Sequence, residues 1–184
     1  KSPIRCMRPD IINYLINEYY KLFDIEICLD KNSNLSNHIE KMINKNHITK
    51  IYPQNLKELC NKIDHIEFGI FIDSGPLHIA KILNKKGVLL STSINKKVLL
   101  NNFNSISENI NNYKSDYCKA PCGLIDIFNY KNKIGCYDSI RVSKDEIINL
   151  KNKNILQRGS LKKSYINFIN NPVGCVKNID YKSV

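Results

Sequence analysis

Apolar positions in the first hundred residues follow two alternating patterns. Short apolar, β-branched runs predict strands at 25–29, 48–52, 65–72 and 87–93. Apolar residues at helical spacing between and before these runs predict helices over 9–22, 35–42, 54–63 and 76–83. Such alternation indicates βαβ units. The sequence therefore predicts an α/β protein with a Rossmann-like, doubly wound parallel sheet.

The pattern weakens after residue 100. The Asn- and Ser-rich segment 101–116 predicts a loop or an irregular crossing. Ser143, followed by Glu146, forms a capping-box pattern that predicts a helix start, and "SYINFI" (164–169) indicates one further helix. We expect a domain over 1–152 and a C-terminal extension over 153–184 whose role the sequence does not assign. Because the chain begins with lysine, we also expect it to be a segment of a longer two-domain protein.

Composition narrows the class of protein. A hydrophobic content of 42% with 24% charged residues is typical of a globular domain. No window approaches the roughly 18 continuous apolar residues of a membrane span, and no basic-then-apolar leader is visible. Seven scattered cysteines, an odd number, predict reduced thiols and a cytoplasmic location.

The net charge of +11 would suit a protein that binds nucleic acid. Lysines are spread through the chain, however, and arginine occurs only at positions 5, 8, 141 and 158. A nucleic-acid footprint is usually a clustered stripe, so diffuse compositional bias is favoured. The positive field still suits a phosphate-bearing ligand, or peripheral contact with anionic lipid at the inner face of the cell membrane.

The turn after the third predicted strand carries the candidate chemistry. In "FGIFIDSGPLHIAKIL" (68–83), Asp73 stands at the carboxyl end of that strand, where open parallel sheets bind ligands. Ser74 is placed to cap the next helix, Gly75 lets a ligand approach, and His78 can donate to a phosphate on the helix N-terminus. Alternatively, the turn only reverses the chain and caps a helix. Residue chemistry alone favours neither interpretation.

"IDSGPLHIAKIL" resembles the signature of the ADP-heptose:lipopolysaccharide heptosyltransferases, glycosyltransferase family nine, which has an Asp-(Ser/Thr)-Gly-x-x-His turn. The similarity extends upstream through "IYPQNLKELCNKIDHIEFGIFID" and downstream to "YCKAPCGL" and "IGCYDSIRVSKDEI", over about residues 48–150. It implies that the chain is the C-terminal, donor-binding domain of a GT-B glycosyltransferase. The chain departs from the family at "LLSTSI", where a Phe-Gly-x-Thr element is common.

The resemblance also assigns roles. The diphosphate and neighbouring ribose of a nucleotide-sugar would lie against Asp73, Ser74, Gly75, Leu77 and His78. Gln54 would line the base pocket, Thr92 would reach a phosphate, and Lys1 would match a phosphate-binding lysine. The family's catalytic base lies in the other domain, so this segment alone should bind donor and turn over little. No cofactor is implied.

A metal site is a weaker hypothesis. Cys118, Cys122 and Cys136 form a C-x3-C pair with a third thiol, and Cys175 is the only later cysteine. Structural zinc needs four ligands, usually in tighter pairs, so three reduced thiols are favoured over a metal centre.

The leading hypothesis is therefore an enzyme that transfers a sugar, a heptose in this family, from a nucleotide-diphosphate donor to a lipopolysaccharide-type or other glycan acceptor. Two alternatives stay open: a catalytically inactive transferase-like domain, and a basic nucleic-acid-binding module.

Overall fold

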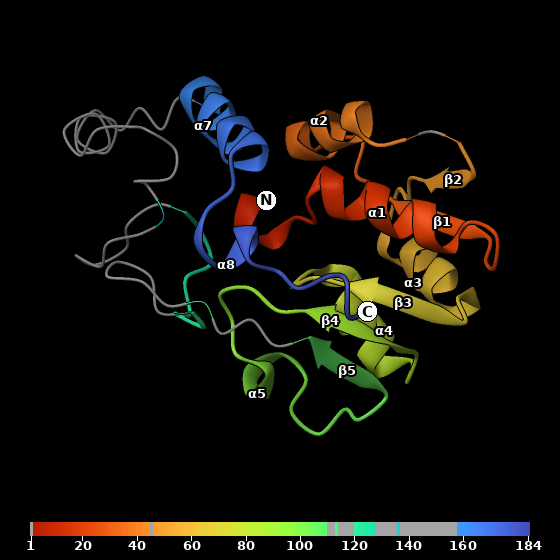
Figure 1. Ribbon diagram of the computed structural model, residues 1–184. Coiled ribbons are helices and arrows are strands. Elements are labelled where there is room, and N and C mark those ends of the chain that lie inside the picture. Colours follow the sequence, from red (N-terminus) through yellow and green to blue (C-terminus); the bar gives the residue numbers. More distant parts are fainter. Residues whose placement is uncertain (1, 45, 110–112, 114–119, 128–135, 137–157) are drawn as a thin grey trace.

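Strands and helices alternate along the chain in the computed structural model, which describes residues 2–44, 46–109, 113, 120–127, 136 and 158–184 (Figure 1). The elements up to β3 are η1 (a short 3₁₀ helix, Pro3–Arg5), α1 (Pro9–Tyr19), β1 (Ile25–Cys28), α2 (Asn34–Met42), β2 (Ile48–Ile51), α3 (Leu56–His65) and β3 (Phe68–Phe71). After them come α4 (Gly75–Ile82), β4 (Lys86–Leu90), α5 (Lys96–Leu99), β5 (Ile106–Asn109), α7 (Arg158–Asn170) and α8 (Gly174–Lys177). Each strand and helix predicted before residue 94 is confirmed.

The strands form two small parallel sheets rather than one. β1 pairs with β2, with Ile25 opposite Ile48, and β4 lies between β3 and β5. The predicted α/β class with parallel strands is therefore confirmed, and the arrangement is compatible with a Rossmann-like fold. Because strands are parallel within each sheet, their carboxyl ends share one edge, where the Asp73 turn follows β3.

Four short elements were not predicted: η1, α5, β5 and α8. Segment 101–116 was expected to be a loop or an irregular crossing, yet β5 forms within it and pairs with β4. β5 reads Ile-Ser-Glu-Asn, and Ile106 is its only apolar residue, 2% exposed. An edge strand with one buried side chain is held by its pairing to β4, and its composition carries no strand pattern. The four-residue helix α5 is likewise too short for a periodic signal.

Two glycines make room for an aromatic ring at the contact between β3 and β4. Gly69 and Gly87 are partners in register, two residues before Phe71 and its partner Leu89. A Cβ on Gly69 would lie 2.1 Å from Cζ of Phe71, and one on Gly87 would lie 2.2 Å from the Gly69 carbonyl oxygen. Phe71, 5% exposed, thus fills the space that both glycines leave and anchors the core beneath α4.

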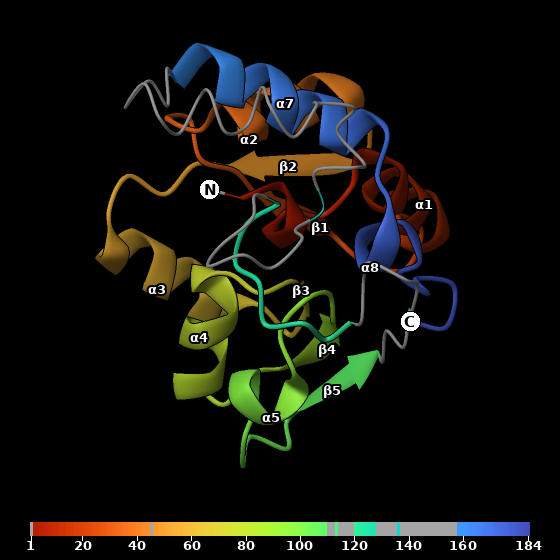
Figure 2. The same cartoon turned by 90° about the vertical axis from the view of Figure 1, so that its left-hand side faces the viewer.

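The C-terminal residues pack onto the N-terminal ones. Phe168 of α7 and Val176 of α8 are fully buried in a cluster that includes Ile4 of η1. α7 also lies beside α2, where Nε2 of His38 and Oδ1 of Asn170 are 2.8 Å apart (Figure 2). The helix predicted from "SYINFI" is confirmed as part of α7. The helix predicted to start at Ser143 falls outside the described residues.

Within the ranges that the structure describes, no helix has the length and apolar character needed to cross a membrane.

Substituting Gly87→Ala should destabilise the protein, because the new Cβ meets backbone that cannot move aside. We expect the free energy of unfolding to fall by about 1–3 kcal/mol, the usual cost of overpacking. Gly75→Ala is the matched control, since nothing lies within 4 Å of its Cβ position, and it should change stability by less than about 0.5 kcal/mol. Urea denaturation measures both; equal losses would contradict the β3–β4 register.

Candidate functional site

The turn between β3 and α4 leaves the start of the helix open. Ser74 occupies the N-cap position, as predicted, but the predicted cap hydrogen bond is absent. Its hydroxyl instead donates to the carbonyl oxygen of Ile72, at 2.9 Å. The backbone N–H groups of Gly75 and Leu77 are thus left without a side-chain cap. Uncapped N–H groups and the helix dipole make this end of α4 attractive to an anion.

Gly75 keeps the approach to this helix end clear. It is exposed, it is the first residue of α4, and no atom of the other described residues outside its own helix lies within 4 Å of the position a Cβ would take. The packing of the described residues therefore does not require glycine here. Leu77, which the resemblance placed against the diphosphate, is fully buried in the core. Only its backbone can face a ligand.

Asp73 is bound by an arginine that the sequence analysis did not single out. Asp73 is 6% exposed, and Nε of Arg5 lies 2.9 Å from its Oδ2 and 3.2 Å from its backbone carbonyl oxygen. Nη2 of Arg5 donates to Oδ1 at 3.2 Å. Among the described residues, Nη1 makes no hydrogen bond. The planar guanidinium is thus fixed by one carboxylate and keeps donors for a second anion.

His78 completes the group. Its Nε2 lies 3.9 Å from Oδ1 of Asp73, and its side chain is 50% exposed. Asp73 therefore lies between two basic side chains, Arg5, which donates hydrogen bonds to it, and His78, which lies near it. This arrangement can bind a phosphate through backbone N–H groups and two side chains, while Asp73 orients the donors.

η1 is held against the carboxyl end of β4 by a second contact. The Thr92 hydroxyl, in a side chain 3% exposed, donates to the carbonyl oxygen of Ile4 at 3.0 Å. The Thr92 proton is therefore used within the protein, and the structure does not direct it toward α4. Ser93 binds the segment 120–127, since its hydroxyl donates to the Leu124 carbonyl oxygen at 2.6 Å and its own carbonyl accepts from Gly123 N–H at 2.7 Å.

Asp126 ties that segment to both chain ends. Its carboxylate accepts from the Ser2 hydroxyl at 3.2 Å and from the Tyr165 hydroxyl of α7 at 2.7 Å. Burial and this hydrogen bond raise the pKa of Tyr165, so its proton stays on the phenol. Asp126 was not predicted, because its partners lie 124 and 39 residues away in sequence.

The remaining predicted residues lie elsewhere. Gln54 is exposed after β2, in the other sheet, and its amide donates to the Tyr52 carbonyl oxygen at 2.6 Å. Lys1 and Cys118 fall outside the described residues. Cys122 is half-buried and Cys136 is buried. In the described part of the chain, no group of three or more His, Cys, Asp or Glu residues is placed to hold a metal ion.

Comparison of the chain with protein-family models, with curated proteins and with solved structures gave no match. The site is therefore defined by its own geometry.

Removing Arg5 should destabilise the fold more than removing an exposed cation. Arg5→Ala removes the cation hydrogen-bonded to the buried Asp73 carboxylate, and we expect a loss of about 1–3 kcal/mol in the free energy of unfolding. Lys62→Ala is the control: its Nζ lies 3.6 Å from Glu26 with both side chains well exposed, and the loss should stay below about 0.5 kcal/mol. A double-mutant cycle with Asp73→Ala measures the coupling; additive losses would contradict a direct pair.

Proposed function

We propose that this chain binds a nucleotide-sugar and forms the donor-binding half of a GT-B glycosyltransferase. The transferred sugar would be a heptose from ADP-heptose, and the acceptor a lipopolysaccharide-type or other glycan. The open N-terminus of α4 beside Arg5 carries the proposal, because uncapped N–H groups and a neighbouring guanidinium suit a phosphate. The nucleoside and the sugar of the proposed ligand are inferred from the resemblance of the Asp73–His78 turn to the heptosyltransferase signature.

Three features support phosphate at this turn. Ser74 turns its hydroxyl away from the helix, so the N–H groups of Gly75 and Leu77 stay open to an anion. Gly75 has open space at its Cβ position among the described residues, which leaves room for an anion at the helix start. Asp73, buried and anionic, does not bind phosphate itself but holds Arg5 in place beside the turn. A turn that served only to start a helix would need none of these three features together.

The same groups suit the chemistry of sugar transfer. Breaking the bond between sugar and diphosphate leaves negative charge on the departing phosphate oxygen. Arg5, His78 and the N-terminus of α4 are placed to stabilise that charge through fixed donors, which need no rearrangement as it develops. The proton of the acceptor hydroxyl must go to a base, which the resemblance places in the family's other domain.

Nucleotide binding tests the proposal through thermal stability. The full chain is heated with ADP, UDP, GDP or CDP, and we expect ADP to stabilise it most. A ligand at 100 times its dissociation constant adds about 2.7 kcal/mol. Gly75→Ala should remove most of this gain, because its methyl group would enter the space where we place the phosphate. The ligand-free protein should stay as stable as before, since among the described residues nothing lies within 4 Å of that Cβ position.

His78→Ala should also weaken the shift, and His65→Ala is its control, an exposed histidine on α3 that binds only the Asn61 carbonyl oxygen within the described residues. Stronger stabilisation by UDP, GDP or CDP than by ADP would still support a glycosyltransferase, but one that uses a different sugar donor. If no nucleotide stabilises the chain, or if Gly75→Ala binds as well as the parent, the proposed site is wrong. The first result would favour the inactive transferase-like domain.

A further inference from the structure

A second surface of the protein combines exposed apolar side chains with lysines. It is formed by the end of α4, the turn into β4, α5 and the turn into β5 (Figure 1). We call it the lysine-rich face, and it comprises Ile82, Val98, Phe103, Lys81, Lys85, Lys86, Lys96 and Lys97. The apolar members are strongly exposed for their type: Ile82 is 80% exposed, Val98 71% and Phe103 38%.

Lys81 joins the parts of this face. Its Nζ donates to the carbonyl oxygen of Leu99 at the end of α5 and lies 4.8 Å from the centroid of the Phe103 ring. Lys81 of α4 therefore lies next to the end of α5 and the turn after it, and Figure 2 shows α4 and α5 as neighbours. The apolar and basic side chains thus belong to one surface of the protein.

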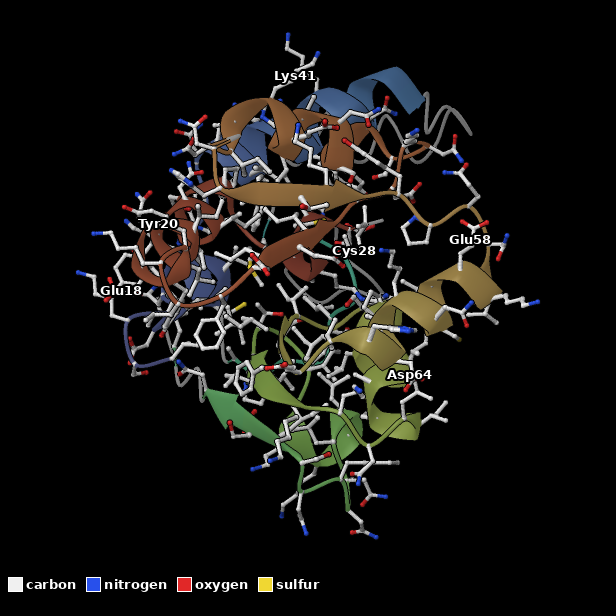
Figure 3. The ribbon with its side chains drawn as sticks, turned by 90° about the vertical axis from the view of Figure 1, so that its right-hand side faces the viewer. Glu18, Tyr20, Cys28, Lys41, Glu58 and Asp64 are labelled. Carbon is white, nitrogen blue, oxygen red and sulfur yellow. The ribbon has the colours of Figure 1, made fainter. Side chains whose placement is uncertain are left out.

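The face is depleted in negative charge. No Asp or Glu occurs between Asp73 and Glu108 in the sequence, a stretch with five lysines. Asp64 at the end of α3, labelled in Figure 3, borders the face, and its Oδ1 lies 3.9 Å from Nζ of Lys85. Glu67 lies just beyond α3 and is exposed. Over the described residues, Lys86, Lys96 and Lys97 form no ion pair, so the face is net positive.

We propose that the lysine-rich face docks on an anionic lipid surface. Aliphatic and aromatic side chains at exposed turns insert into the interface between headgroups and acyl chains, while neighbouring lysines bind the headgroups. Exposed aliphatic residues would contribute little to binding nucleic acid, which uses stacking aromatics and arginine. The turns into β4 and β5 lie at the sheet edge opposite the Asp73 turn, whereas α5 follows the carboxyl end of β4.

Vesicle sedimentation with the full chain tests this surface. We expect binding to phosphatidylcholine vesicles that contain phosphatidylglycerol, little binding to phosphatidylcholine alone, and weaker binding at high salt. Ile82→Ser with Val98→Ser should lower the partition coefficient by at least about tenfold, since burying one aliphatic side chain is worth roughly that factor. Lys96→Glu with Lys97→Glu should abolish binding to the anionic vesicles.

The matched controls change equally exposed residues elsewhere. Leu22→Ser with Leu56→Ser alters side chains 73% and 69% exposed, and Lys57→Glu alters an exposed lysine on α3. These variants should bind as the parent does, with unchanged melting temperatures throughout. The proposal is overturned if the chain binds neither vesicle, if it binds both equally, or if the controls lose as much as the face variants. Binding to a short DNA duplex that competes with the vesicles and needs the same lysines would assign the face to nucleic acid instead.

Discussion

The buried carboxylate of Asp73 is the constraint on which the site depends. A charge 6% exposed is costly unless it is paired, and Arg5 provides the pair with its fork of donors. Because Arg5 belongs to η1, the pair brings the first residues of the chain over the carboxyl end of β3. Thr92 and Ser2 then fix η1 on either side, through Ile4 and Asp126. The ion pair joins η1 to the end of β3, and the two hydrogen bonds join the same N-terminal residues to the end of β4 and to the segment 120–127.

The same constraint gives the turn its chemical character. Asp73 consumes part of the donor capacity of Arg5 but fixes the guanidinium beside the start of α4, where it can meet a second anion. Ser74 forgoes the cap that its position offers, and Gly75 leaves the approach open. The missing serine cap costs the helix about 1 kcal/mol of stability that a purely structural turn would have kept. Such exceptions to local rules are typical of functional positions.

The spacing of apolar residues predicted those strands and helices that are long enough to have a periodic apolar face. The strands and helices before residue 94 have apolar faces several residues long, and all of them formed. β5 has one buried residue and α5 has four residues, so neither leaves a pattern to detect. The split into two sheets depends on pairing between strands, which composition does not encode. Asp73, Gly75 and His78 could be located because they share one turn. Arg5 and Asp126 act across 68 and 124 residues, a distance over which spacing predicts nothing.

An NMR titration of the full chain with ADP tests the central claim most directly, that Asp73 presents Arg5 to a phosphate at the start of α4. The signals to follow are the backbone amides of Gly75 and Leu77 and the Nη1 protons of Arg5, which Asp73 leaves unused. The account predicts that these three groups shift together, with one dissociation constant, and that Asp73→Asn weakens the response of all three. Shifts confined to other residues, or amide shifts that leave the Arg5 Nη1 signals unchanged, would contradict it.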